Sequence, residues 1–218
     1  MAVLVNNTPK YNLYRNSLLS QLIMAPEIVK AQGCYLFEKN GNKILDGLAQ
    51  FGAVPLGHNP SELKNAIVEY LSKDAPIFIQ PFTSTSSDEL SHRLCQLAGK
   101  SYDFVVFTNS GAETVEATIK LARMKTRKKK ILSASNSFHG KTFCALSATG
   151  STKYSNEFIV NEQDFTKVPF NDLVALETAL SSKVYAAFIV EAIQGEGGMI
   201  VADQDYLQAV QQLCQQYG

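Results

Sequence analysis

The sequence predicts an α/β protein with three layers, in which a mostly parallel sheet is flanked by helices, with a small α+β segment at the N-terminus. Three observations lead to this prediction. Several short apolar segments lack the polar alternation of half-exposed strands, amphipathic segments separate them, and polar turns containing glycine follow them. Strands buried on both faces occur in parallel sheets that helices cover on each side. Ligands of such sheets bind beyond the carboxyl ends of the strands.

We expect residues 1–50 to form the N-terminal segment and residues 51–218 to form the larger domain. In the first, the apolar residues between Ser17 and Met24, together with Ile28, indicate a short helix. Residues 34–46 have the pattern of a β-hairpin, because two apolar runs flank a polar, glycine-containing loop.

Two helices are expected to open the larger domain. The first is capped by Ser61 and keeps its apolar residues at helical spacing. A loop rich in Pro, Ser and Thr then covers residues 76–87. The second helix begins at a capping box formed by Ser86 and Glu89 and ends at Gly99.

Strands and helices alternate in the rest of the chain. Short apolar runs predict the strands, and apolar residues at helical spacing predict the helices. The expected strands cover residues 104–108, 130–134 and 184–190. The expected helices cover residues 112–124 and 204–217, and residues 142–146 are expected to be the start of a further helix. The polar turns that follow these strands should therefore lie at one edge of the sheet.

The composition is that of an ordinary folded protein. The chain has 218 residues, of which 45% are hydrophobic and 18% charged, and its formal net charge is zero. This balance gives no indication of a nucleic-acid partner or of a membrane partner. No apolar run has the length of a membrane span, so we expect a cytoplasmic protein. The four cysteines are scattered, which indicates neither a metal site nor a disulfide framework.

The turn Ser110-Gly111-Ala112-Glu113 follows an expected strand and opens an expected helix. The free N–H groups and the positive end of a helix favour a phosphate at such a place. An ordinary capping box between Ser110 and Glu113 would have the same sequence. Glycine at the first helical position weakens a helix but lets a ligand approach the backbone. The phosphate interpretation and the capping interpretation both remain open at this point.

Two further turns carry residues suited to a flat ligand. In Phe138-His139-Gly140 the aromatic ring follows a short strand and could cover a ligand, although such a ring is more often part of a core. His139 is better explained as a hydrogen-bonded structural residue than as a base. In the segment 191–198, Glu191 comes at a strand end and Glu196 lies among glycines, where a solvated loop is the alternative.

These segments resemble class III aminotransferases, which are pyridoxal-phosphate-dependent enzymes of fold type I. The resemblance rests on VVFTNSGAETVEATIK (residues 105–120), SFHGKT (residues 137–142) and EAIQGEGG (residues 191–198). It implies that Ser110, Gly111 and Ala112 hold the phosphate of pyridoxal 5'-phosphate, and that Phe138, with His139 next to it, lies against the pyridine ring. Glu191 would lie near the cofactor. Lys141 stands where the family usually has Arg, and Ala192 where it usually has Pro.

The resemblance also implies roles at the substrate side. Glu196 would act as a gate that pairs with an arginine, and the stretch around Gly52 would line the substrate entrance, although a turn before a helix explains that stretch equally well. The implied reaction moves an amino group from an amino donor to a 2-oxo acid or an aldehyde. The family's active sites form between two subunits, so a homodimer or a complementary C-terminal half is the expected partner.

No residue of this chain matches the family's Schiff-base lysine or the acidic residue at the pyridine nitrogen, which lie further along the family's sequence. The resemblance therefore implies the N-terminal portion of an aminotransferase, with an incomplete large domain. A chain of this kind would have groups that fit the cofactor but no covalent anchor for it, and we expect it to have no normal turnover. The alternative is a non-catalytic remnant or split subunit that binds a phosphorylated ligand or a partner chain.

Overall fold

A computed structural model describes residues 26–79, 82–99, 102–155, 158, 160–161 and 163–218. The chain divides into two compact units, Met1–Asp88 and Glu89–Gly218, and each is described by itself. The sequence-based division between residues 50 and 51 follows a different criterion and stays a prediction.

The first unit contains a three-stranded antiparallel sheet, with its strands in the order β1-β2-β3. The strands are β1 (Ile28–Gln32), β2 (Tyr35–Glu38) and β3 (Lys43–Leu45). The expected hairpin is confirmed, with Gly41 in its loop at a φ of +90°. Ile28 lies in β1, paired with Glu38, so the helix expected to include it does not reach this residue. The rest of that helix lies outside the described residues.

Two helices follow the sheet along the chain. Helix α2 spans Ser61–Leu71, with Pro60 at the N-cap position, and helix α3 spans Thr85–Ala98. The expected capping box of Ser86 and Glu89 is wrong, because α3 starts earlier and Ser84 Oγ accepts from the Ser87 amide. Neighbouring hydroxyl residues can all cap a helix, so their composition does not select one.

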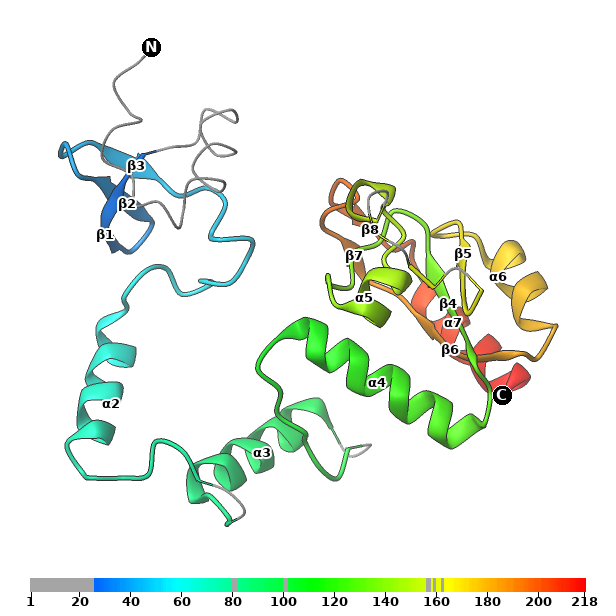
Figure 1. The fold of residues 1–218 in the computed structure, drawn as a ribbon, viewed down its shortest axis with the longest axis horizontal. Coiled ribbons are helices and arrows are strands. Elements are labelled where there is room, and N and C mark those ends of the chain that lie inside the picture. The colour runs from blue at the N-terminus through cyan, green and yellow to red at the C-terminus, as the bar shows by residue number, and fades with distance from the viewer. Residues whose placement is uncertain (1–25, 80–81, 100–101, 156–157, 159, 162) are drawn as a thin grey trace. The chain divides into compact units, whose positions relative to one another are not determined.

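The second unit is built on a parallel sheet with the strand order β5-β4-β6 (Figure 1). Its strands are β4 (Lys130–Ala134), β5 (Phe165–Val168) and β6 (Tyr185–Ile189). Its helices are α4 (Gly111–Thr126), α5 (Phe143–Ala148), α6 (Leu173–Leu180) and α7 (Tyr206–Tyr217), with a short 3₁₀ turn η2 (Thr152–Tyr154) after α5. A small antiparallel pair, β7 (Ile193–Gln194) and β8 (Ile200–Val201), follows β6.

Helices cover both faces of this sheet, as the sequence predicts. Leu132 of β4 packs in one hydrophobic cluster with residues of α6 and α7, and its neighbour Ile131 packs in another with residues of α4 and α5. Successive side chains of a strand point to opposite faces, so one strand contributes to both clusters. Both side chains are fully buried. The three-layer arrangement is therefore confirmed within the second unit.

The expected strand at 104–108 does not form in the described part of the chain. This segment is not helical, yet no ladder joins it to β4, β5 or β6, and Phe104 and Val106 are exposed. A strand is stabilised by pairing with a neighbour, and apolar sequence does not provide that neighbour. Strand β5 and helix α6 were not predicted from the sequence.

In the part of the chain that the structure describes, no helix is long and apolar enough to cross a membrane.

Candidate phosphate and ring site at the carboxyl ends of the strands

The start of α4 has the geometry of a capped helix with an open first turn. Ser110 is the N-cap in an extended conformation, and its Oγ accepts from the Glu113 amide at 3.2 Å. The Glu113 carboxylate bonds back to the Asn109 amide at 2.6 Å. No described residue accepts a hydrogen bond from the amides of Gly111 or Ala112. Ser110 therefore caps the helix, while Glu113 reaches the amide before the N-cap residue and not the N-cap amide of a standard capping box. Two backbone donors of the first turn have no acceptor among the described residues.

Two hydrogen bonds of Ser137 hold the Phe138 loop at the carboxyl end of β4. Ser137 Oγ donates to the Ala134 carbonyl oxygen at 2.6 Å, and the Gly150 amide donates to Ser137. Gly150 sits so close to Ala134 that a Cβ on it would clash with the Ala134 carbonyl oxygen. These contacts fix the direction in which the chain leaves the sheet before it reaches Phe138.

Gly140 connects this loop with the start of α4. Its φ is +128°, and a Cβ on it would lie 2.8 Å from the Cβ of Ala112. Only glycine combines that backbone conformation with so close an approach. The aromatic turn and the helix N-terminus are thus neighbours.

The turn after β6 joins the same edge of the sheet. Glu191 Oε2 accepts from the Phe138 amide at 2.9 Å. Gln194 is fully buried, and its Nε2 donates to the Ser135 carbonyl oxygen at 2.8 Å. The turns that hold Ala112, Phe138 and Gln194 therefore meet in one region, at the carboxyl ends of β4 and β6.

Two side chains, those of Tyr154 and Lys141, lie next to the Phe138 ring. Tyr154 packs edge-on against it, with ring centroids 5.1 Å apart and an interplanar angle of 63°. The Lys141 ammonium lies 6.0 Å from the Phe138 centroid and 5.0 Å from that of Tyr154. Tyr154 Oη donates to Glu196 Oε2 at 2.5 Å. Glu196 therefore stands next to the aromatic pair.

Two ionisable groups of the site are perturbed by burial. Burial raises the pKa of Glu191, and the hydrogen bond from the Phe138 amide opposes that rise. Burial, with the positive charge of Lys167, lowers the pKa of His139 to about 4. The His139 amide donates to Thr149 Oγ1, while its buried Nε2 has no partner among the described residues. The imidazole is therefore buried and neutral, but the structure gives its Nε2 no hydrogen-bond partner among the described residues, so the structural role of His139 stays a prediction.

Gly52 belongs to the first unit. It has a φ of +80° and follows three residues, Ala49, Gln50 and Phe51, which also have positive φ. Residues other than glycine adopt this conformation at a cost of roughly 1 to 2 kcal/mol each, so the turn is a strained one. The predicted role of Gly52 at a substrate entrance stays a prediction.

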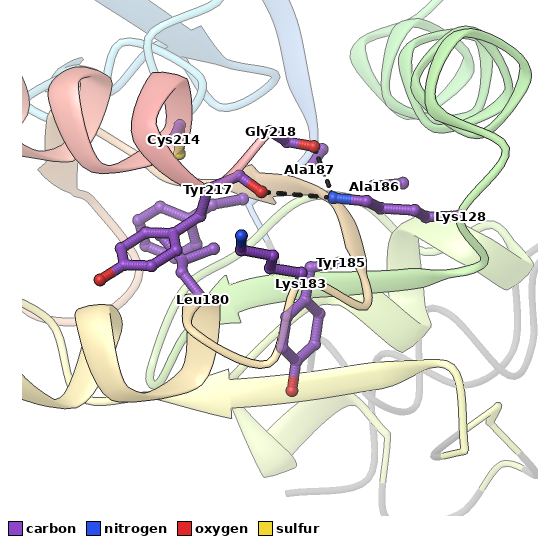
Figure 2. A pocket seen from close by; sticks show the side chains of 10 residues that line it. Lys128, Leu180, Lys183, Tyr185, Ala186, Ala187, Cys214, Tyr217 and Gly218 are labelled. Carbon is purple, nitrogen blue, oxygen red and sulfur yellow. Dashed lines mark hydrogen bonds between the residues drawn. The ribbon is translucent and has the colours of Figure 1, made fainter.

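A small cavity lies among β6, α6 and α7, and Figure 2 shows the residues that line it. Its volume is about 60 Å³. Tyr185, at the amino end of β6, and Cys214 and Tyr217 on α7 are among its lining residues. Lys128 Nζ donates to the carbonyl oxygens of Tyr217 and Gly218, where a cation also complements the end of a helix. This cavity contains none of the predicted site residues.

Sequence reasoning missed three residues that shape the site: Glu116, Tyr154 and Lys167. Glu116 accepts hydrogen bonds at the start of α5, and Lys167 donates to the Ser147 carbonyl oxygen from β5. Each is an ordinary residue of its segment, and no local pattern distinguishes it. Among the described residues, no group of His, Cys, Asp or Glu could hold a metal ion.

Comparisons with known proteins agree with this architecture. The family model named Aminotransferase class-III matches residues 20–218. Among curated proteins, Aminotransferase PigE of Serratia sp. (strain ATCC 39006) is 40% identical over 188 residues, which are 86% of this chain and 22% of that protein. Acetylornithine aminotransferase of Bacillus anthracis is 38% identical over 192 residues, which are 88% of this chain and 49% of that protein.

Solved structures give the same result. The ornithine aminotransferase of Toxoplasma gondii ME49 has a TM-score of 0.81 at 25% identity, covering 96% of this chain and 55% of that chain. A taurine:2-oxoglutarate aminotransferase from Bifidobacterium kashiwanohense, in complex with PLP and glutamate, has a TM-score of 0.81 at 27% identity, covering 94% and 53%.

The fold is that of a pyridoxal-phosphate-dependent transferase, and the chain belongs to the class III aminotransferase family. It spans about half the length of the Bacillus acetylornithine aminotransferase and of the solved structures that it matches.

Proposed function

We propose that the second unit binds pyridoxal 5'-phosphate, with the phosphate at the start of α4 and the pyridine ring against Phe138. The contact between Gly140 and Ala112 is the observation that carries this proposal. It brings the helix N-terminus and the aromatic ring to one place, where a single phosphorylated aromatic molecule can reach both.

The residues at the start of α4 fit a phosphate. The Gly111 and Ala112 amides have no acceptor among the described residues, and the N-terminus of a sixteen-residue helix attracts an anion. A Cβ on Gly111 would meet no atom within 4 Å, so the space in front of the helix is open. The Ser110 hydroxyl can donate to a phosphate oxygen while it accepts from the Glu113 amide.

The pyridine ring fits the face of Phe138. When bound, the cofactor supplies an electron-accepting ring for the chemistry of an amino group. Phe138 covers that ring and excludes water, while Glu191 holds the Phe138 loop through the backbone amide. Glu196 adds a carboxylate at the rim of the site. His139, which is buried and neutral, supports this loop through its backbone amide, which donates to Thr149 Oγ1.

We propose that the whole protein transfers an amino group from an amino donor to a 2-oxo acid or an aldehyde. The relatives named above, which act on acetylornithine, ornithine or taurine by name, support this class of reaction. The reacting lysine is expected in the part of the family's sequence to which these 218 residues do not correspond. A second chain is expected too, either another copy or a complementary half.

Binding of pyridoxamine 5'-phosphate tests the cofactor proposal, since this analogue needs no lysine for attachment. We expect calorimetry to detect its binding to the chain, and inorganic phosphate to compete with it. Gly111→Gln should abolish both, because the new side chain fills the space in front of the helix amides. Thr118→Gln, which places the same side chain at an exposed position within α4, should bind like the wild-type chain.

Three results would contradict this proposal or narrow it. A wild-type chain that binds neither compound at millimolar concentration would contradict it. Binding of phosphate without binding of pyridoxamine phosphate would favour the remnant that takes a simpler phosphorylated ligand. Equal binding by Gly111→Gln would move the phosphate away from α4.

A further inference from the structure

Tyr154 lies between two parts of the candidate site, the Phe138 ring and the Glu196 carboxylate. It ends the short η2 turn after α5, and its side chain is half-buried. The ring packs edge-on against Phe138, and the hydroxyl reaches Glu196 Oε2 at 2.5 Å. A single side chain thus touches the proposed ring cover and the carboxylate at the rim.

We propose that Tyr154 is a positioning residue, which fixes the Phe138 ring through its own ring and the Glu196 carboxylate through its hydroxyl. This inference rests on the proposed cofactor site and deepens it. The two contacts also couple the two residues, because Glu196 cannot turn to another partner without releasing the hydroxyl of the residue that supports Phe138.

The ring contact restricts the orientation of Phe138. An edge-on aromatic pair prefers one relative orientation, so Tyr154 selects the Phe138 rotamer before a ligand arrives. If the Phe138 side chain already has its bound orientation, a flat ring binds more tightly, because less side-chain freedom is lost on binding. Lys141, whose ammonium lies over both rings, adds a cation–π contact on the same cluster.

The hydroxyl contact holds Glu196 in place. A hydrogen bond from a phenol to a carboxylate is shorter and stronger than one between neutral groups, and the two oxygens lie 2.5 Å apart here. The same bond, together with burial and the charge of Glu196, raises the pKa of Tyr154. A titration of the phenol therefore reports directly on whether the contact exists in solution.

The first experiment is an ultraviolet titration of tyrosinate in the chain, which has nine tyrosines. Tyr154→Phe should remove one phenol that ionises at high pH. Glu196→Gln should move the titration of one phenol to lower pH, and this shift should vanish when the Tyr154→Phe change is also present. Tyr185→Phe, at the amino end of β6, should leave the effect of Glu196→Gln intact. No shift with Glu196→Gln would overturn the hydroxyl half of the proposal.

The second experiment separates the ring from the phosphate. Tyr154→Leu should weaken pyridoxamine phosphate binding roughly three- to tenfold, the value of one aromatic pair, and leave inorganic phosphate binding unchanged. Unchanged phosphate binding also shows that the variant is folded. If Tyr154→Leu does not fold, the comparison of Tyr154→Phe with Glu196→Gln still decides the hydroxyl contact.

The outcomes separate this inference from the proposed function. Pyridoxamine phosphate binding that Tyr154→Leu leaves unchanged would overturn the role of Tyr154 alone. A wild-type chain that binds no pyridoxamine phosphate would overturn the proposed function, and with it the ring half of this inference. A loss of phosphate and pyridoxamine phosphate binding in equal measure would overturn the positioning role in favour of a general structural one.

Discussion

One carboxylate oxygen of Glu116, on α4, accepts hydrogen bonds from three groups at the start of α5. The donors are Thr142 Oγ1 at 2.7 Å, the Cys144 amide at 2.8 Å and the Ala145 amide at 3.2 Å. The first amides of a helix have no partner within the helix, so a side chain of α4 takes the place of a cap on α5. The Phe138 loop leads into α5, and Glu116 therefore determines where that loop ends.

Glu116→Gln should destabilise the second unit by about 1 to 2 kcal/mol, because a charge-assisted cap is replaced by a neutral one. Burial raises the pKa of Glu116, but the hydrogen bonds from Thr142, Ala145 and Cys144 lower it more, so the folded value lies below the ordinary 4.5. The stability from this carboxylate is present above pH 4.5 and is lost as the pH falls through the folded pKa. Urea unfolding measured between pH 3 and pH 7 should show a weaker acid dependence in the variant. Thr142→Val, which removes one donor and keeps both amides, should have a smaller effect.

Gly140→Ala should destabilise the second unit more than Gly198→Ala. Both glycines have positive φ, +128° and +112°, so both variants carry backbone strain of about 1 to 2 kcal/mol. Only Gly140→Ala adds a clash, with Ala112, which should cost about 1 to 3 kcal/mol more. The same clash should weaken binding of inorganic phosphate, since it pushes against the start of α4. Equal unfolding midpoints for the two variants in urea would contradict the close approach of Gly140 and Ala112.

His139 should make the second unit less stable as the pH falls. Burial, together with the charge of Lys167, lowers its pKa from 6.5 to about 4, so the unfolded chain binds a proton that the folded chain does not. Stability from the neutral form is fully present above pH 6.5 and declines toward pH 4, by up to roughly 3 kcal/mol. His139→Gln should flatten the pH dependence of the unfolding free energy over this interval.

Lys167→Met should raise the pKa of His139, because the charge of Lys167 is the second cause of its depression. The chain has three histidines, so proton NMR can follow each ring, with His139 assigned by its loss in His139→Gln. Lys167 is itself half-buried, and burial lowers its pKa to about 8. The wild-type chain should therefore gain stability as the pH rises from 8 to 10.5, and Lys167→Met should lack this gain. If the His139 resonance has the same pKa in the wild-type chain and in Lys167→Met, the charge of Lys167 does not lower the pKa of His139.

Gln194→Leu should loosen the turn after β6. Gln194 is fully buried and its amide satisfies the Ser135 carbonyl oxygen, so the variant leaves a buried acceptor unpaired at a cost of about 1 to 3 kcal/mol. Hydrogen exchange should become faster at the Phe138 amide, which depends on Glu191 in the same turn. Gln208→Leu, an exposed position on α7, should change stability by less than about 0.5 kcal/mol. Similar exchange rates in the two variants would argue against the anchoring role of Gln194.

Local pattern predicted the elements whose stability depends mainly on their own residues. The hairpin around Gly41, helix α4 with its Ser110 cap and strand β4 are where the sequence places them. Strand β5 and helix α6 were missed, although Asp172 caps α6 through the Ala175 amide. Periodicity is weak in short elements, and a strand such as β5 is recognised only once β4 pairs with it.

The sequence by itself determined the α/β class, the capped start of α4 and the family, because helix caps, buried apolar runs and contiguous motifs depend on neighbouring residues. Only the tertiary structure decided which distant side chains meet. Ala112 against Gly140, Phe138 against Glu191 and Tyr154 between Phe138 and Glu196 all join residues that the chain separates by a whole element or more. Such contacts follow from the order in which strands pair and the direction in which each turn leaves the sheet, and no local pattern encodes either of them.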